Sequence, residues 1–363
     1  MHIVLISTPI GFLGSGKGGG VEITLDSVVF GLANKGHFLD VVAPMNSKIP
    51  ESYQNVKLHT VDGEEQISWQ HQDYYSPVSI PNNSLITAMM EKALLIGKDA
   101  DLILNFSYDW LPIWMTTNID IPMAHLISMG SESFIITNLI KKVHAVLPRN
   151  FAFHTYTQAS DYPFIKSPNI VGNGFRLDNY SFQNCKNGPI AWVGRVAPEK
   201  GLEDAAYVAN ELGEKLLVWG FIQDESYATK IEKMFKPGTV EWKGFLETSN
   251  LQKELGTCRA LLNTPKWNEA YGNVVVEAMA CGVPVVAYKR GGPSEIVQHG
   301  ITGFLAKPDD KKSLLTYLEQ IEKIDRKNCR DWVEKNASTN IFAVKVLKWL
   351  NTIITEYKSL RKL

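Results

Sequence analysis

Two carboxylates stand eight positions apart, at Glu269 and Glu277, on either side of a glycine turn. We expect Gly272, Asn273 and Val274 to turn the chain into a helix that begins near Val274, and backbone N–H groups at a helix start can hold a phosphate. Glu277 is expected in the first helical turn, where it can accept hydrogen bonds from vicinal hydroxyls. Glu269 could approach the same ligand from its other end, as a nucleotide sugar would require. The alternative is two structural glutamates that flank a core segment.

Two basic residues follow an apolar run in the second half of the chain. Arg195 and Lys200 are five positions apart, across Pro198, in the glycine-flanked segment 194–201. A planar guanidinium and a mobile ammonium can converge on one diphosphate. The alternative is that both side chains are solvated cations on a loop.

A glycine-rich segment, residues 14–22, follows the first apolar run and opens a predicted helix. Glycines let the backbone approach a ligand closely and expose several N–H groups. The segment is not a Walker A loop, because Lys17 is not followed by Ser or Thr, and it lacks the spacing of a dinucleotide fingerprint. A flexible connection between a strand and a helix is the alternative.

His125 lies inside the apolar run 122–128. A single histidine on an apolar strand is more often a core residue than a catalyst. A position near a strand end that faces a cleft would favour a site, and Ser128 and Ser131 could then help to shape it.

The segment 105–114 is rich in aromatic residues for a connection between a strand and a helix. Tyr108 and Trp110, with Asp109 between them, could stack on and hydrogen-bond to a flat or sugar-like ligand. Packing in the core is an equal alternative.

The composition is that of a globular protein and excludes several classes. Of 363 residues, 45% are apolar and 21% charged, and the formal net charge of −1 leaves no electrostatic footprint for nucleic acid. Four scattered cysteines lack metal-ligand spacing, so free thiols in the cytoplasm are expected. The apolar start reads as a first strand and not as a signal peptide. No apolar run is long enough to span a membrane, and residues 139–147 form only a mild basic amphipathic patch.

Short apolar runs alternate with helical stretches in both halves of the chain, which predicts parallel strands that are buried on both faces. Strands are expected at residues 3–6, 38–43, 101–105, 122–128, 189–193, 215–219, 240–243, 260–263 and 283–287, and helices at 21–35, 202–212 and 340–363. Two such halves, each with a glycine-rich turn near its start, predict two Rossmann-like domains that face each other across a cleft. The Asn-Gly segment 171–175 and the polar stretch to Gly188 mark the boundary.

The spacing of Glu269 and Glu277 resembles the Glu-x7-Glu motif of retaining glycosyltransferases of family 4, which have the GT-B fold. The segment 194–201 resembles the family's Gly-Arg-x4-Lys-Gly motif, and the resemblance covers most of the chain. It implies an acceptor-binding domain at residues 1–172, a nucleotide-sugar-binding domain at 173–339 and a C-terminal helix, 340–363, that returns to the first domain.

The resemblance also implies a role for each matching residue. Glu277 would bind the ribose hydroxyls, and Glu269 the transferred sugar. Arg195 and Lys200 would contact the leaving diphosphate, His125 the sugar at the reaction centre. The remaining donor contacts would be Gly19 and Gly20 beside the diphosphate, and the backbone of Phe245 and Leu246 at the edge of a uracil.

The implied reaction is transfer of a hexose, glucose from UDP-glucose in the first instance, with retention and without a metal or other cofactor. The segments 7–16 and 125–130 look like those of cyanobacterial glucosyltransferases that act on tetrahydrobiopterin, with Tyr108, Asp109 and Trp110 as candidate acceptor contacts. A saccharide or lipid acceptor is the alternative within the family. A UDP-sugar epimerase of the same architecture, a phosphorylase and a non-enzymatic nucleotide-sugar binder are further alternatives.

Overall fold

The computed structural model describes residues 1–15 and 18–360. Gly16 and Lys17 of the glycine-rich segment, and residues 361–363 of the predicted last helix, lie outside the described residues. The chain divides into two compact units: Met1–Phe175 with Thr339–Leu363, and Arg176–Ser338. The sequence placed these divisions after residues 172 and 339. How the predicted domains face each other stays a prediction.

The first unit contains a seven-stranded parallel sheet in the order β3-β2-β1-β4-β5-β6-β7. Its strands are β1 (His2–Ile6), β2 (Phe38–Pro44), β3 (Val56–Val61), β4 (Leu102–Asn105), β5 (Met123–Ile127), β6 (Phe151–Phe153) and β7 (Asn169–Ile170). Its α-helices are α1 (Gly20–Ala33), α2 (Leu85–Gly97), α3 (Trp110–Met115), α4 (Phe134–Val146), α5 (Tyr156–Ser160) and α13 (Thr339–Leu360).

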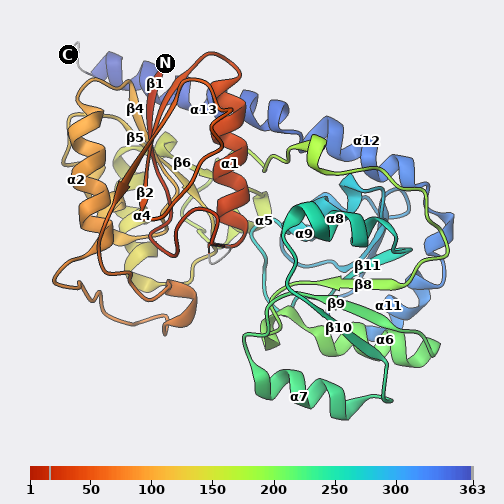
Figure 1. Ribbon diagram of the computed structural model, residues 1–363. Helices are drawn as coiled ribbons and strands as arrows, with labels where there is room; N and C mark the ends of the chain where they lie inside the picture. Colours follow the sequence, from red (N-terminus) through yellow and green to blue (C-terminus); the bar gives the residue numbers. More distant parts are fainter. Residues whose placement is uncertain (16–17, 361–363) are drawn as a thin grey trace. The chain divides into compact units, whose positions relative to one another are not determined.

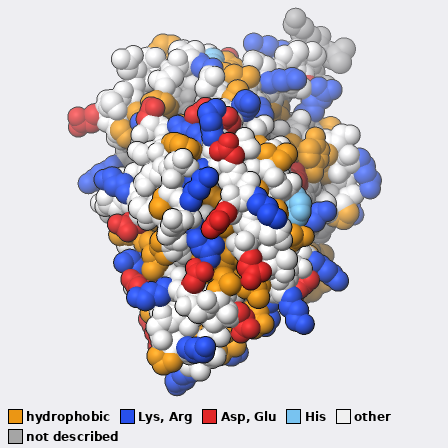
Figure 2. Space-filling view, turned by 90° about the vertical axis from the view of Figure 1, so that its right-hand side faces the viewer, with side chains coloured by type: hydrophobic (Ala, Val, Ile, Leu, Met, Phe, Trp, Pro, Cys, Tyr) orange, Lys and Arg blue, Asp and Glu red, His pale blue; other side chains and the backbone are white. Residues whose placement is uncertain are grey.

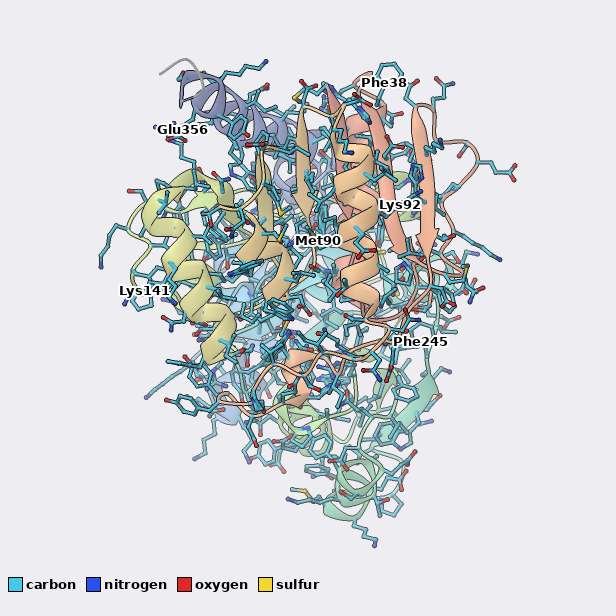
Figure 3. The ribbon with its side chains drawn as sticks, turned by 90° about the vertical axis from the view of Figure 1, so that its left-hand side faces the viewer. Phe38, Met90, Lys92, Lys141, Phe245 and Glu356 are labelled. Atoms are coloured by element: carbon cyan, nitrogen blue, oxygen red, sulfur yellow. The ribbon has the colours of Figure 1, made fainter. Side chains whose placement is uncertain are left out.

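Alternation along β1 explains why this sheet is covered on both faces. Ile3 and Leu5 belong to an apolar cluster with residues of α1 and α13, whereas Val4 and Ile6 belong to one with residues of α2. Successive side chains of a strand point to opposite faces, so a run of apolar residues needs helices on both sides. Figure 1 shows α1 and α2 on opposite sides of the sheet, and Figure 3 views it from the α2 side, with Met90 and Lys92 labelled on that helix.

The second unit contains a six-stranded parallel sheet in the order β10-β9-β8-β11-β12-β13. Its strands are β8 (Ile190–Val193), β9 (Leu216–Trp219), β10 (Val240–Gly244), β11 (Ala260–Asn263), β12 (Val285–Tyr288) and β13 (Gly303–Ala306). Its α-helices are α6 (Leu202–Leu212), α7 (Glu225–Met234), α8 (Thr248–Gly256), α9 (Asn273–Ala280), α10 (Pro293–Ile296), α11 (Lys311–Leu318) and α12 (Arg326–Asn336). The four cysteines are unpaired, as predicted.

Each sheet has one point at which the strand order reverses, between β1 and β4 in the first unit and between β8 and β11 in the second. Ligands of open α/β sheets bind outside the carboxyl ends of the strands at such a point. In the first unit, the glycine-rich segment follows β1 and Tyr108 to Trp110 follow β4. In the second unit, Arg195 and Lys200 follow β8, and residues 264–272 follow β11. The topology therefore brings most of the predicted site residues to these two edges.

Candidate functional site

The turn at Gly272 opens helix α9, as the sequence predicted. Gly272 is the N-cap, with φ 99° and ψ 58°, and the helix begins at Asn273. Glycine suits this left-handed backbone, and a Cβ added to it would lie 2.9 Å from the Pro293 ring and 3.6 Å from Oε2 of Glu269. The start of α9 therefore lies beside the Glu269 carboxylate, with N–H groups of its first turn suited to an anion.

Glu277 corrects one detail of the prediction. It is the fifth residue of α9 and therefore lies beyond the first helical turn, which contains no acidic residue. The side chain is buried, with the residue 5% exposed, and its Oε1 accepts a hydrogen bond of 3.1 Å from the Tyr180 hydroxyl. Burial raises the pKa of Glu277 to about 7, so this carboxyl is poised between its neutral and ionised forms near neutral pH.

Lys200 and Glu269, which are far apart in the sequence, form a close ion pair. The Lys200 Nζ lies 2.6 Å from Oε1 of Glu269, and the same ammonium lies 5.1 Å from the centre of the Trp267 ring. Glu269 is buried, and its Oε2 has no hydrogen-bond partner. One carboxylate oxygen is thus held by a cation, while the other is available to a ligand hydroxyl.

Arg195 has other partners. Its guanidinium donates to Oε1 of Gln223 and lies 3.1 Å from Oε1 of Glu199, and its side chain is about one third exposed. The predicted convergence of Arg195 and Lys200 on one diphosphate stays a prediction, because the two cations pair with different acidic residues here.

Two loops that carry site residues are joined by backbone and side-chain contacts. The Lys266 N–H donates to the Glu199 carbonyl over 2.8 Å, and the Thr264 hydroxyl donates to the Gly201 carbonyl over 2.8 Å. Gly201 has φ 64°, and a Cβ added there would lie 2.1 Å from the Thr264 carbonyl oxygen, so a side chain would separate the loops. These contacts fix the loop of Lys200 against the loop that leads to Glu269.

A buried carboxylate reinforces this junction. Asp204, near the start of α6, is 4% exposed, pairs with the Lys266 ammonium and accepts a hydrogen bond of 2.6 Å from the Tyr288 hydroxyl. Lys266 also lies 3.1 Å from Asp309, which in turn pairs with Arg290 at 2.5 Å. Burial lowers the pKa of Lys266, but the hydrogen bonds to Asp204 and Asp309 together outweigh burial and raise it. Lys266 therefore stays charged.

Several unpartnered polar atoms belong to residues at strand ends of the second sheet, and sequence reasoning missed two of these residues, Asn263 and Trp267. Among the described residues, four buried side-chain atoms without a hydrogen-bond partner belong to residues that end β9 or β11 or follow β11: Trp219 Nε1, Asn263 Oδ1, Trp267 Nε1 and Glu269 Oε2. Buried polar groups are nearly always hydrogen-bonded, so a group of exceptions indicates a place for a ligand or ordered water. Their positions at strand ends were the available signal.

Phe245 and Leu246 directly follow β10, and Phe245 is 62% exposed. The preceding Gly244 carbonyl accepts a hydrogen bond of 3.0 Å from the Gly220 N–H, which ties the ends of β9 and β10 together. The predicted contact of the Phe245 and Leu246 backbone with a uracil stays a prediction.

In the first unit, the start of α1 already holds a carboxylate. Gly19 is the N-cap and Gly20 the first helical residue. The two oxygens of Glu22 accept hydrogen bonds of 2.8 Å from the N–H groups of Gly14 and Gly18. Part of the predicted anion-binding backbone is therefore occupied by the protein's own carboxylate.

The predicted contact of His125 with the transferred sugar stays a prediction. His125 is fully buried in the middle of β5. Its Nδ1 lies 3.1 Å from Asn105 Nδ2, its Nε2 lies 2.7 Å from the Thr116 hydroxyl, and its ring stacks on Phe151. Burial lowers the pKa of His125 to about 3, so the ring is a neutral core residue. Ser128 and Met129, just past the end of β5, are partly exposed.

Tyr108 and Asp109 are buried and Trp110 is half-buried. The Tyr108 hydroxyl donates to the Gly130 carbonyl over 3.1 Å. Oδ1 of Asp109 and Nε1 of Trp110 have no partner. These residues are part of the core, yet two of them retain unused hydrogen-bonding capacity.

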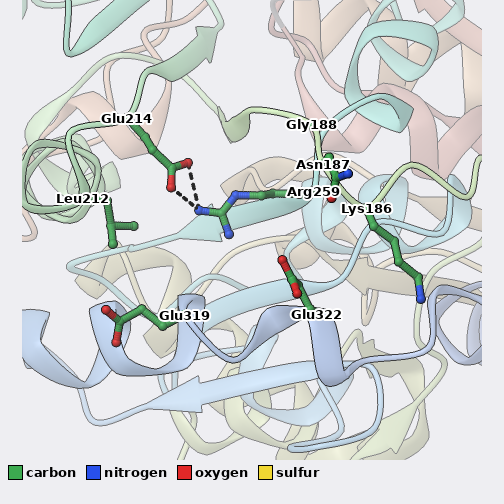
Figure 4. A pocket seen from close by; sticks show the side chains of 8 residues that line it. All are labelled: Lys186, Asn187, Gly188, Leu212, Glu214, Arg259, Glu319 and Glu322. Atoms are coloured by element: carbon green, nitrogen blue, oxygen red, sulfur yellow. Dashed lines mark hydrogen bonds and ion pairs between the residues drawn. The ribbon is translucent and has the colours of Figure 1, made fainter.

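A pocket of about 390 Å³ lies elsewhere, at the amino ends of β8, β9 and β11 (Figure 4). Arg259 crosses it and forms two hydrogen bonds of 2.9 Å with the carboxylate of Glu214. Its lining includes none of the predicted site residues, and it lies at the end of the strands opposite the candidate site.

Residues 183–339 match the family described as "Glycosyl transferases group 1". This segment forms most of the second unit. A probable sucrose-phosphate synthase of Thermosipho melanesiensis is 25% identical over 224 residues, and the sulfoquinovosyl transferase SQD2 of Arabidopsis thaliana is 35% identical over 135 residues. These alignments cover 58% and 36% of this chain and 53% and 26% of the relatives, so the chain spans about half or less of their length.

Solved glycosyltransferases match both units. Sucrose-phosphate synthase of Thermosynechococcus elongatus gives a TM-score of 0.77 at 18% identity, covering 98% of this chain and 100% of that one. Anabaena Alr3699/HepE in complex with UDP-glucose gives 0.72 at 16% identity, covering 97% of this chain and 100% of that one. These likenesses confirm the predicted fold, two parallel-sheet Rossmann-like domains of the GT-B class.

Among the described residues, no helix combines the length and the apolar composition that crossing a membrane requires. Figure 2 shows one face of the molecule, on which cationic and acidic side chains are interspersed. In the part of the chain that the structure describes, His, Cys, Asp and Glu side chains form no group of three or more that could hold a metal ion.

Proposed function

We propose that this protein is a retaining glycosyltransferase that transfers a hexose, in the first instance glucose from UDP-glucose, to a small acceptor. The observation that carries this proposal is the buried Glu269 carboxylate, with Lys200 on one oxygen and no partner on the other, beside the start of α9. A cation, a helix N-terminus and an unpaired carboxylate oxygen in one place suit a sugar diphosphate. The family match of residues 183–339 supports the same assignment.

The residues of the second unit would divide the work on the donor. As the bond between C1 of the sugar and the diphosphate oxygen breaks, negative charge develops on the diphosphate. Lys200, Arg195 and the N–H groups at the start of α9 would stabilise that charge, which requires no divalent cation. Oε2 of Glu269 would accept a hydrogen bond from a sugar hydroxyl, and Glu277 hydrogen bonds from the ribose. UDP-glucose complexes of the similar HepE structure support this choice of donor.

The acceptor oxygen would attack C1 from the face that the diphosphate leaves, and its proton would pass to the leaving diphosphate. The new bond therefore keeps the α configuration of the donor, and Glu269 orients the sugar without acting as a nucleophile. Binding of the acceptor is proposed for the first unit.

Tetrahydrobiopterin is the first acceptor to test, on the resemblance of residues 7–16 and 125–130. A saccharide is the second candidate, favoured by the similarity to sucrose-phosphate synthases in both sequence and fold.

Release of UDP from UDP-glucose, measured in EDTA with and without tetrahydrobiopterin or fructose, tests the proposal. Acceptor-dependent release in EDTA is expected. Release only after a divalent cation is added would contradict metal independence, and conversion of the sugar without any acceptor would indicate an epimerase. Absence of both UDP binding and release would reject the proposed function.

A further inference from the structure

The unpartnered buried polar atoms of the first unit lie in two segments. Among the described residues of that unit, they are Gln66 Nε2 and Ser84 Oγ, in a loop between β3 and α2, and Asp109 Oδ1 and Trp110 Nε1, after β4. We call residues 64–84 the covering loop. The two segments meet, because Trp69 of the covering loop belongs to the same apolar cluster as Tyr108 and Trp110.

The covering loop is closed at its base and fastened near its middle. The Glu64 N–H donates to the Asn83 carbonyl over 2.6 Å, and the Leu85 N–H donates to the Glu64 carbonyl over 3.1 Å. The Phe134 N–H, at the start of α4, donates to the Tyr74 carbonyl over 2.8 Å. Loops with joined ends that pack on their own side chains frequently carry function.

Asp109 is the strongest sign of a ligand under this loop. The residue is 2% exposed and stands at the carboxyl side of β4, where ligands of such sheets bind. Burial raises the pKa of Asp109 to about 6. Its Oδ1 has no partner, which is rare for a buried carboxyl oxygen. A bound molecule that donates a hydrogen bond would satisfy it.

The charged side chains beside the segment of Asp109 are acidic. The loop from β5 to α4 carries Glu132, whose pKa is raised by burial and then by the neighbouring Asp161. A Cβ added to Gly130 would lie 2.5 Å from Oδ2 of Asp161, so that carboxylate lies directly against the loop. The Tyr108 hydroxyl, bonded to the Gly130 carbonyl, joins this acidic group to the segment of Asp109. A phosphate placed here would face repulsion from carboxylates.

We propose that the first unit binds the acceptor at the carboxyl ends of β4 and β5, beneath the covering loop, and that this acceptor is an uncharged or cationic molecule with N–H or O–H donors. Asp109 Oδ1 accepts one of those donors, and the Trp110 N–H donates to a polar atom of the same molecule. Phosphorylated acceptors are rejected. Because Trp69 packs in the same cluster as Tyr108 and Trp110, part of the covering loop must move for the acceptor to enter. This inference rests on the proposed function and names the acceptor class.

A panel of acceptors that differ in charge tests the inference. UDP release from UDP-glucose is measured with fructose, glucosamine, fructose 6-phosphate and tetrahydrobiopterin at equal concentrations, and UDP affinity is measured separately by calorimetry. We expect stimulation by at least one uncharged or cationic compound, and stimulation by fructose 6-phosphate at least tenfold lower. A preference for fructose 6-phosphate, or stimulation by none of the four while UDP still binds, overturns the inference and leaves the donor site intact. Failure to bind UDP instead counts against the proposed function.

Asp109→Asn keeps the size of the side chain and removes its charge, and it is expected to raise the KM for the stimulating acceptor at least tenfold with unchanged UDP affinity. Asp99→Asn is the matched control, because Asp99 is exposed and precedes the amino end of β4. Trp110→Phe keeps the aromatic packing and removes the unpaired N–H, so it serves where Asp109→Asn does not fold. A KM unchanged in the folded variant, or raised equally in Asp99→Asn, would refute the placement of the acceptor.

Discussion

The ammonium of Lys200 lies 2.6 Å from Oε1 of Glu269, across a sequence separation of 69 residues. Lys200 ends the short 3-10 helix after β8, and Glu269 lies in the loop after the neighbouring strand, β11. Their loops are joined through Lys266, Glu199, Thr264 and Gly201. The pair therefore places a positive charge and a free carboxylate oxygen at the point where the strand order reverses.

Lys200→Ala is expected to lower kcat/KM for UDP-glucose by about a hundredfold, the scale of loss when one donor to a developing negative charge is removed. Steady-state kinetics of UDP release measure it. Lys215→Ala is the control, because Lys215 is 68% exposed and pairs with Glu241 at the other end of β9. Similar losses in both variants would show that Lys200 has no special part in the reaction.

Arg195→Ala is expected to lower kcat by more than it raises KM, because its contact with the diphosphate strengthens as charge develops. Glu199→Gln, which removes the ionic partner of Arg195, is expected to keep kcat within about threefold of the wild-type value. A rise in KM alone for Arg195→Ala would mean that the guanidinium binds ground state and transition state equally.

Glu277→Ala is expected to weaken UDP binding by more than about tenfold, since charge-assisted hydrogen bonds to the ribose would be lost. Calorimetric titration with UDP provides the measurement. Glu225→Ala serves as a control, because Glu225 is an exposed glutamate at the start of α7 in the same unit. Unchanged UDP affinity in Glu277→Ala would remove Glu277 from the donor site.

The raised pKa of Glu277 also predicts a dependence of stability on pH. Burial raises the pKa of Glu277 from its ordinary value of 4.5 to about 7, so the folded protein favours the neutral carboxyl. The neutral Glu277 carboxyl therefore contributes to the free energy of unfolding. This contribution is fully present below pH 4.5, and about 3 kcal/mol of it is lost as the pH rises through 7. Denaturant unfolding of the unliganded wild-type protein and of Glu277→Gln at pH 5 and pH 8 should show this difference only in the wild type. Parallel pH profiles of the two proteins would contradict it.

Asp204→Asn is expected to reduce kcat about tenfold and to destabilise the fold by about 1–2 kcal/mol. This destabilisation is smaller than the cost of breaking a fully buried ion pair, because Lys266 keeps its contact with Asp309. UDP-release kinetics and thermal unfolding are measured together, with Asp331→Asn, from the exposed Lys327 pair, as control. If kcat is unchanged in a destabilised Asp204→Asn, Asp204 stabilises the unit without positioning the Lys200 and Glu269 loops.

Local patterns predicted part of the elements, and strands β3, β6, β7 and β13 were not among them. The sequence placed α6 at residues 202–212 and β11 at 260–263, and the structure has the same bounds. The strand expected at 283–287 begins instead at Val285, after Pro284, which has no N–H to donate to the ladder. Runs of apolar residues, glycines and prolines act over a few neighbouring positions, and they are visible without knowledge of the rest of the chain.

The sequence by itself therefore determined the two α/β units, the bounds of α6 and β11, and the turn at Gly272. Only the tertiary structure decided that Lys200 pairs with Glu269 and that His125 lies in the core. It also decided that Glu277 and Asp109 are buried, and hence that the pKa of each is raised. Ion pairing and desolvation depend on which distant segments pack together, and residue types and spacing within one segment do not carry that information.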